Sequence, residues 1–246
     1  MAEEKLAVLI DADNVSYANV REMMEEISKY GNPTIKRIYA DWTKPSLSGW
    51  KNVLLENAIT PIQQYSYTTG KNSSDSALII DAMDILYSEK VNGFCIVSSD
   101  SDFTRLATRL REAGMTVIGF GEKKTPQPFI SACNKFIYLE ILKSRAPEGK
   151  VEKKVAKSKT DGELLKKVDQ GTVQLIIESA SDLADETGWT FLGNLGNFIL
   201  KKKPDFDPRN YGFPKLLPLI RALKKFEIDE RESGQGNIRH IYLKLK

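Results

Sequence analysis

Short apolar runs alternate with helix-like segments through the first 140 residues, and this alternation constrains the fold more than any other feature. The segments near residues 16–30, 47–58, 74–88 and 102–113 have helical patterns. The apolar runs are Leu6–Ile10, Ile35–Ala40, Pro61–Tyr65, Phe94–Val97, Met115–Phe120 and Phe136–Leu139. Val- and Ile-rich strands that alternate with helices are typical of parallel sheets, because each parallel connection needs a crossover. We therefore predict an α/β fold in which helices cover both faces of a mostly parallel sheet.

The distribution of charge divides the chain. Residues 1–144 carry 16 basic and 18 acidic residues, whereas residues 145–246 carry 20 and 15. Much of the basic excess lies in Arg145–Lys159, which has six basic residues, two acidic residues and no sustained apolar stripe. This composition is typical of a solvated linker, with phosphate contact as the alternative role. We expect a first domain over residues 1–144, a basic linker over 145–165 and a second domain over 166–246.

The second domain has a different pattern. Helical stretches near residues 171–185, 191–202 and 214–225 precede two strand-like runs, Phe226–Glu230 and Ile238–Leu245. A Ser-Gly-Gln-Gly segment joins the two runs, as in a hairpin. Three helices followed by a hairpin predict a small winged-helix domain.

Composition argues against several kinds of site. The chain has one histidine, His240, and two cysteines, Cys95 and Cys133, in apolar surroundings. Zinc sites need more such residues, and a single histidine argues against a histidine-dependent triad, so we expect any catalysis to use carboxylates, hydroxyls or lysines. No apolar run approaches the roughly 18 residues of a membrane helix, and the N-terminus lacks the features of a signal peptide. We expect a cytoplasmic protein without a membrane span.

Acidic residues follow two of the predicted strands. Asp11, Asp13 and Asn14 come directly after the first apolar run, and Ser99–Asp102 follows the fourth. Open parallel sheets bind ligands beyond the carboxyl ends of their strands. Helix capping explains one polar residue at each place. Clustered carboxylates repel one another unless a cation lies between them, so two clusters at one sheet edge favour a metal site.

A third acid comes from the helical segment Ser74–Ser88. On a wheel of about 100° per residue, four apolar side chains fall on the same side as Asp75. Asp75 therefore shares the apolar face near the helix start, from where it can point toward the strand ends; an interaction with the helix dipole is the alternative. Asp81 and Asp84 fall on the opposite side, where we expect them to be solvated.

These observations predict one acidic group made of Asp11, Asp75, Asp100 and Asp102. Hard oxygen ligands of this kind suit Mg²⁺ or Mn²⁺. Such an ion can activate water and stabilise the phosphate during phosphodiester hydrolysis, and no histidine is needed.

The segments that carry these acids resemble an NYN domain, a branch of the PIN-like nuclease superfamily. They read LIDADN, KNSSDSALIIDAMD and IVSSDSDFTRLATRLREAGMTVIGFG, and the resemblance extends from Leu6 to Leu142. It implies a Rossmann-like sheet with an acidic pocket and a metal-dependent ribonuclease activity. By motif, the family's metal-binding acids fall on Asp11, Asp75, Asp100 and Asp102. We expect supporting roles for Asn14, Asp13, Asp81 and Ser99.

The C-terminal part, from Gly171 to Lys246, resembles an OST-HTH or LOTUS domain. The supporting segments are LGNLGNF at residues 192–198 and KPDFDPRNYGF at 203–213. The resemblance implies a winged-helix fold that binds RNA or docks a protein. Basic residues interleaved with aromatics suit contacts with phosphates and bases. The expected RNA-binding residues are Lys71, Lys201, Lys202, Lys203, Arg209, Tyr211 and Lys215. The alternative is that Tyr211 is a core residue and the lysines form a solvated face.

The function expected from these features is metal-dependent cleavage of single-stranded or looped RNA, most simply as an endonuclease. Two alternatives remain open. One is an RNA-binding adaptor without catalytic activity. The other is a phosphatase of the haloacid-dehalogenase type, since Asp11–Val15 fits the start motif D-x-D-x-[TV]. The spacing of Asp100 and Asp102 departs from the final acidic motif of those phosphatases.

Overall fold

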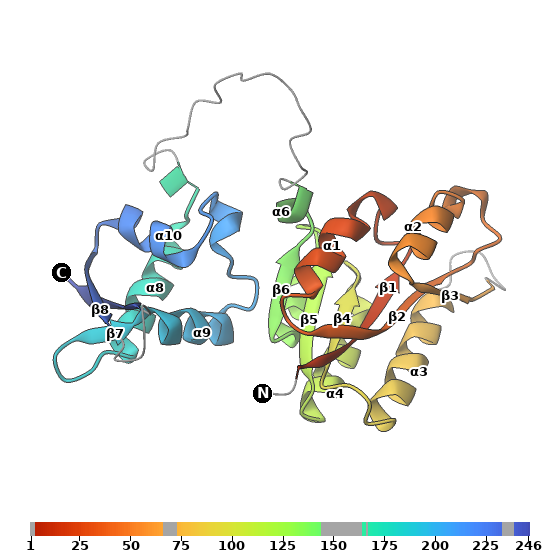
Figure 1. The fold of residues 1–246 in the computed structure, drawn as a ribbon, viewed down its shortest axis with the longest axis horizontal. Helices are drawn as coiled ribbons and strands as arrows, with labels where there is room; N and C mark the ends of the chain where they lie inside the picture. The colour runs from red at the N-terminus through yellow and green to blue at the C-terminus, as the bar shows by residue number, and fades with distance from the viewer. Residues whose placement is uncertain (1–2, 66–72, 144–163, 166, 233–238) are drawn as a thin grey trace, which may run out of the picture. The chain divides into compact units, whose positions relative to one another are not determined.

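The structure is a computed structural model that describes residues 3–65, 73–143, 164–165, 167–232 and 239–246. The predicted linker over residues 145–165 lies almost wholly outside these ranges, as do Lys71 and the Ser-Gly-Gln-Gly segment. The chain divides into two compact units, Met1–Pro147 and Glu148–Lys246, which we describe separately (Figure 1).

The first unit contains a six-stranded sheet in which every neighbouring pair is parallel. Its strands are β1 (Lys5–Asp11), β2 (Asn32–Ala40), β3 (Thr60–Gln63), β4 (Gly93–Val97), β5 (Thr116–Gly121) and β6 (Lys135–Tyr138). Their order in the sheet is β3-β2-β1-β4-β5-β6. The prediction of an α/β fold with a parallel sheet is confirmed.

Helices cover both faces of this sheet. One layer contains α1 (Val20–Ile27), α2 (Trp50–Asn57) and α6 (Glu140–Lys143), and the other contains α3 (Ser73–Tyr87), α4 (Thr104–Glu112) and α5 (Gln127–Ala132). In Figure 1 the first layer lies above the sheet, and α3 and α4 lie below it. Side chains of β1 alternate between the two layers, since Val8 packs in one apolar cluster and Leu9 in the other.

Two short helices, α5 and α6, have no counterpart among the predicted segments. They contain six and four residues, which is too few for a helical period to show in the sequence. Three single-turn 3₁₀ helices, η1 (Tyr17–Asn19), η2 (Pro45–Leu47) and η3 (Ser101–Phe103), also begin or precede the longer helices.

The strands β1 and β4 are adjacent, with Ile10 beside Val97. After β1 the chain enters α1 on one face, and after β4 it enters α4 on the other face. This divergence makes the carboxyl ends of the two strands a topological switch point, which is where open α/β sheets bind ligands. The strand order therefore places the loops after Asp11 and Val97 side by side.

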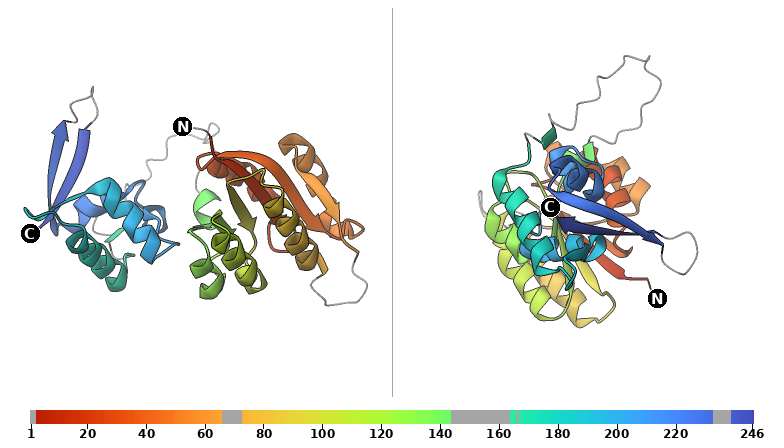
Figure 2. Two further views of the ribbon diagram at one scale, coloured as in Figure 1. Left: turned by 90° about the horizontal axis from the view of Figure 1, so that it is seen from below. Right: turned by 90° about the vertical axis from the view of Figure 1, so that its left-hand side faces the viewer.

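The second unit is a small helical domain with an antiparallel sheet. Its elements are α8 (Gln170–Asp182), β7 (Trp189–Phe191), α9 (Leu192–Lys202), η4 (Pro208–Tyr211), α10 (Leu216–Leu223), β8 (Phe226–Glu232) and β9 (Arg239–Leu245). The sheet has the order β7-β9-β8, and the left view of Figure 2 shows the hairpin of β8 and β9 projecting from the helices. Ile176, Leu195 and Leu219 form its core with Leu243. The predicted helices and hairpin are confirmed, and β7 is an additional third strand.

No helix in the described ranges is long and apolar enough to cross a membrane.

Candidate metal centre

Asp11 is the last residue of β1, and its carboxylate is buried, with 1% of the residue exposed. Three donors hold it. The backbone N–H of Asp13 donates to Oδ1 at 3.1 Å, and Oδ2 accepts from Asn14 Nδ2 at 2.6 Å and from Ser98 Oγ at 2.9 Å. Burial raises the pKa of Asp11, and these hydrogen bonds oppose that rise. These donors, from the loops after β1 and β4, thus orient the Asp11 carboxylate at the carboxyl end of β1.

The loop after β4 supplies the next two acids. Asp100 is the N-cap of η3, and its Oδ1 accepts from the backbone N–H of Asp102 at 2.9 Å. The N–H of Asp100 in turn donates to Ser98 Oγ at 3.0 Å. The capping role considered from the sequence is therefore real for Asp100, and it positions Asp102 on the next turn.

The third acid approaches from α3. Asp75 lies in the first turn of that helix and is only 8% exposed. Asp75, Asp100 and Asp102 each present a carboxylate oxygen, and these oxygens lie within 4.8 Å of one another. Opposite ligands of one Mg²⁺ ion are about 4 Å apart, because each metal–oxygen bond is about 2.1 Å long. The three acids therefore fit a shared hard cation.

Burial and the charges of neighbouring acids both disfavour ionisation of Asp75. The pKa of Asp75 is raised to about 6, first by burial and then by the charges of Asp11, Asp100, Asp102 and Asp13 in that order. An acid that resists ionisation among other acids is stabilised by a nearby cation. A divalent metal bound among these carboxylates would offset the unfavourable ionisation of Asp75.

The four predicted ligands are not equivalent in the structure. Asp75, Asp100 and Asp102 form the group within 4.8 Å, which we call the acid group, and Asp11 is not part of it. Asp11 is nevertheless close enough to be the second-largest contribution to the raised pKa of Asp75. It lies beside the acid group with its oxygens bound to protein donors.

The residues that we expected to support the site have different contacts. Asn14 holds Asp11, as described above. Asp13 points elsewhere and pairs with Lys44 at 3.6 Å. Ser99 is buried, and its hydroxyl accepts from the backbone N–H of Glu122 at 2.8 Å, so it ties β4 to the loop after β5. The residue that sequence reasoning missed is Ser98, since a single serine between a strand and an acidic motif has no distinctive signal.

The expectation that Asp81 is solvated is wrong. Its carboxylate pairs with the Arg37 guanidinium and accepts a hydrogen bond from the Tyr39 hydroxyl, both on β2. The helix α3 packs over β2, so its polar side meets this cation and hydroxyl rather than water. Asp84, one turn further on, is exposed as expected.

The predicted RNA-binding residues of the second unit have different environments. Lys201 and Lys215 are exposed. Lys202 Nζ pairs with Asp182 at 2.8 Å, and Lys203 Nζ lies 3.4 Å from Thr172 Oγ1. These four lysines keep charge at or near the surface.

Arg209 and Tyr211 are mostly buried. The Arg209 guanidinium binds both carboxylate oxygens of Asp207, and only 16% of its side chain is exposed. Tyr211 is a core residue whose hydroxyl lies 3.0 Å from Thr172 Oγ1. A ring packed in the core has no free face for a base, so we remove Tyr211 from the RNA-binding set. Lys71 lies outside the described residues.

Comparison with known families agrees with the division of the chain. Residues 5–140 match the family model of the NYN domain, and residues 163–238 match that of the OST-HTH/LOTUS domain. No curated protein matches the chain significantly.

Two of the solved structures that are similar to this chain cover part of it. One is a protein of unknown function from Vibrio parahaemolyticus, which is 21% identical and superposes with a TM-score of 0.46. The match covers 55% of this chain and 91% of the Vibrio chain. The other is an uncharacterised protein from Nitrosomonas europaea, 26% identical, with a TM-score of 0.30, covering 41% of this chain and 91% of its own.

Proposed function

The chain belongs to the NYN domain family, whose members have a PIN-like nuclease fold, and on this premise we propose that it is a metal-dependent ribonuclease. The reaction is hydrolysis of RNA phosphodiester bonds, most simply as an endonuclease. The observation that carries the proposal is the acid group of Asp75, Asp100 and Asp102, with oxygens within 4.8 Å of one another.

The residues have distinct proposed roles. Asp75, Asp100 and Asp102 would hold Mg²⁺ or Mn²⁺, which suit carboxylate oxygens. The bound ion supplies an activated water and stabilises charge on the phosphate. Asp11 adds negative charge beside the acid group, and Asn14 and Ser98 fix its orientation. Residues 1–147 contain no histidine, so the first unit itself offers no histidine base to this group.

The second unit is proposed to raise affinity for RNA. LOTUS domains bind RNA, and this one exposes Lys201 and Lys215 with Lys202 at the surface. The acid group repels a phosphate backbone, and basic residues on the same chain offset that repulsion. Tethering two RNA-binding parts also increases the effective concentration of RNA at the acid group.

The test is cleavage of labelled RNA by the purified full chain. Single-stranded, hairpin and circular RNAs would be incubated with Mn²⁺, with Mg²⁺ or with EDTA. We expect cleavage only with metal, and cleavage of the circle identifies an endonuclease. Asp100→Asn should abolish cleavage and keep the fold, because asparagine is an equally good N-cap. Undiminished cleavage in EDTA, or by this variant, would falsify the proposal.

A second candidate is an RNA-binding adaptor without activity. It is favoured by the role of Asp100 as a helix cap, which is structural and needs no metal. In the same assay an adaptor binds RNA and leaves it intact with every metal. The phosphatase alternative has its acid/base at Asp13, which pairs with Lys44 at 3.6 Å, and the same assay tests it because such a phosphatase cleaves only phosphomonoesters.

A further inference from the structure

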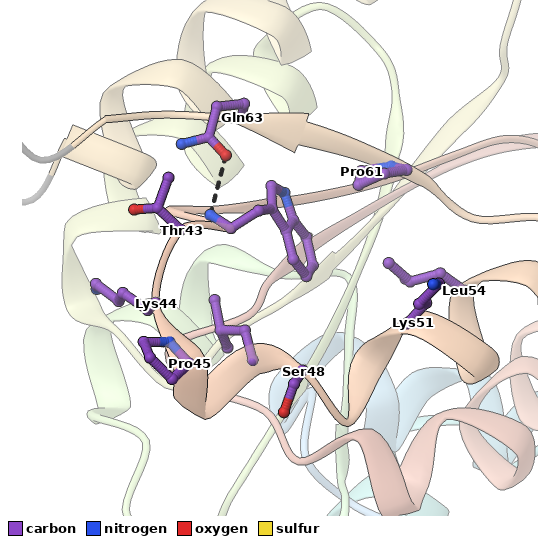
Figure 3. Close-up of a pocket in the computed structure, with 10 residues that line it drawn as sticks. Thr43, Lys44, Pro45, Ser48, Lys51, Leu54, Pro61 and Gln63 are labelled. Carbon is purple, nitrogen blue, oxygen red and sulfur yellow. Dashed lines mark hydrogen bonds between the residues drawn. The ribbon is translucent and has the colours of Figure 1, made fainter.

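A cavity of about 570 Å³ lies beside the strands β2 and β3. The loop after β2, the turn η2, the helix α2 and the strand β3 form its walls. Figure 3 shows Lys44 and Pro45 at one end of the cavity and Leu54 and Pro61 at the other. A cavity of this size with mostly apolar walls is typical of a site for a small organic group.

One wall of the cavity is an aromatic ring that the backbone holds in place. The indole N–H of Trp42 donates to the Ile62 carbonyl at 3.0 Å. The backbone N–H of Trp42 donates to Gln63 Oε1 at 3.0 Å, the bond drawn in Figure 3. Trp42 is half-buried against the core. A fixed aromatic ring at a partly open cavity suits stacking with a flat ring, since little conformational entropy is lost on binding.

The rim of the cavity is basic. Lys44 and Lys51 both line it, and both are exposed. Lys44 Nζ pairs with Asp13 at 3.6 Å, whereas Lys51 has no carboxylate partner within the described part of the chain. Two ammonium groups beside an aromatic wall complement a nucleotide, which has a flat base and a negatively charged phosphate.

The cavity and the acid group both lie at the carboxyl edge of the sheet. The Ala12 N–H donates to the Tyr39 carbonyl at 3.2 Å, so the end of β2 lies against the loop after β1. Asp11 ends β1 and Asp13 lies in that loop, where it pairs with Lys44 on the cavity rim. The charges of Asp11 and Asp13 both act on Asp75, so this loop lies between the cavity rim and the acid group.

We propose that the cavity binds the base of one nucleotide of single-stranded RNA. The base stacks on Trp42, and the phosphates of the same nucleotide contact Lys44 and Lys51. The strand then continues to the acid group. The proposal that a nucleotide binds here depends on the walls and charges of the cavity. Only the direction in which the strand continues depends on the proposed ribonuclease function. Base–aromatic stacking and basic contacts to the backbone are the usual means by which proteins hold single strands.

The test measures binding without cleavage. The full chain in EDTA would be titrated with a short labelled oligouridine, and a photoreactive thiouridine analogue would be cross-linked and its attachment mapped by mass spectrometry. We expect attachment within residues 42–54. Lys51→Glu and Trp42→Leu should each lower affinity by about tenfold and reduce attachment there. Lys90→Glu, at an exposed lysine before β4 and away from the cavity, is the matched control and should bind as wild type.

The outcomes separate the two proposals. Attachment outside the cavity, together with wild-type affinity in Lys51→Glu, overturns the cavity proposal even if the protein cleaves RNA. Attachment in the cavity with a tenfold loss in Lys51→Glu supports it even if the protein cleaves no RNA. Because Lys51 is an exposed side chain, its replacement keeps the fold, and a thermal melt of Trp42→Leu checks the other variant.

Discussion

The hydroxyl of Ser98, at the end of β4, donates a hydrogen bond of 2.9 Å to Oδ2 of Asp11, at the end of β1. The same oxygen of Ser98 accepts from the N–H of Asp100 at 3.0 Å. Ser98 is fully buried, so these bonds are shielded from water. One hydroxyl thus sets the position of two acids, Asp11 at the end of β1 and Asp100 in the loop after β4.

Replacing Ser98 with alanine should slow RNA cleavage by about 10–100-fold, the usual cost of losing a group that orients metal-binding residues. The matched control is Ser99→Ala, because Ser99 is also buried but binds the Glu122 N–H. We expect that control to lower stability more than the cleavage rate. Equal rate losses in the two variants would contradict a specific role for Ser98.

Asp75→Asn should reduce cleavage more than the roughly 100-fold upper value for an orienting group, because it removes a proposed metal ligand. Asp84→Asn, on the same helix and exposed to solvent, should leave the rate unchanged. Initial cleavage rates at saturating Mn²⁺ measure both. If the two variants behave alike, Asp75 does not act through the acid group.

The metal-free protein should be stabilised by Asp75→Asn at neutral pH. The pKa of Asp75 is about 6 in the folded protein and 3.8 in the unfolded reference, so the folded state binds the proton more tightly. The free energy of unfolding therefore falls as the pH rises from about 4 to about 6, and the full cost is present above pH 6. A shift of about two units corresponds to at most about 3 kcal/mol.

Urea denaturation in EDTA at neutral pH and near pH 4 measures this effect. The variant should be more stable than wild type at neutral pH, and the difference should vanish near pH 4. Adding Mn²⁺ should stabilise the wild type more than the variant. A variant that is less stable than wild type at neutral pH would show that Asp75 is not under repulsion.

Asp81→Asn should lower stability and spare activity. The variant weakens the ion pair with Arg37 and the hydrogen bond from Tyr39, which costs about 1.5–3 kcal/mol for bonds to a charged group. The cleavage rate per folded molecule should stay close to wild type, because Asp81 is outside the acid group. A large loss of rate without loss of stability would instead favour the supporting role at the site that we expect from the sequence.

A chain ending at Leu142 should keep metal-dependent cleavage and bind RNA more weakly. Every phosphate that the second unit neutralises adds about 0.7 to the steepness of log affinity plotted against log salt, so the shorter chain should have a shallower salt dependence. Filter binding over a series of salt concentrations measures both quantities. Unchanged affinity and slope would assign the second unit to docking a protein partner.

The layered architecture and the edge of the sheet where the acids gather can be read from the amino-acid sequence. Alternating apolar runs and helical periods report burial directly, so the six strands and the longer helices could be predicted. Asp11 and Asp100 follow apolar strands, and all carboxyl ends of a parallel sheet share one edge whatever the strand order. A local pattern was sufficient for both inferences.

The contacts between these side chains depend on the tertiary fold and cannot be read from the sequence. The order of the strands sets β1 beside β4, and this contact joins Ser98 to Asp11 across 87 positions of sequence. Packing of α3 over β2 gives Asp81 a cation that the helical wheel cannot show, and packing of the second unit buries Tyr211. Helical and strand periods describe one element at a time, whereas a buried polar side chain is satisfied by whichever neighbour the fold brings to it.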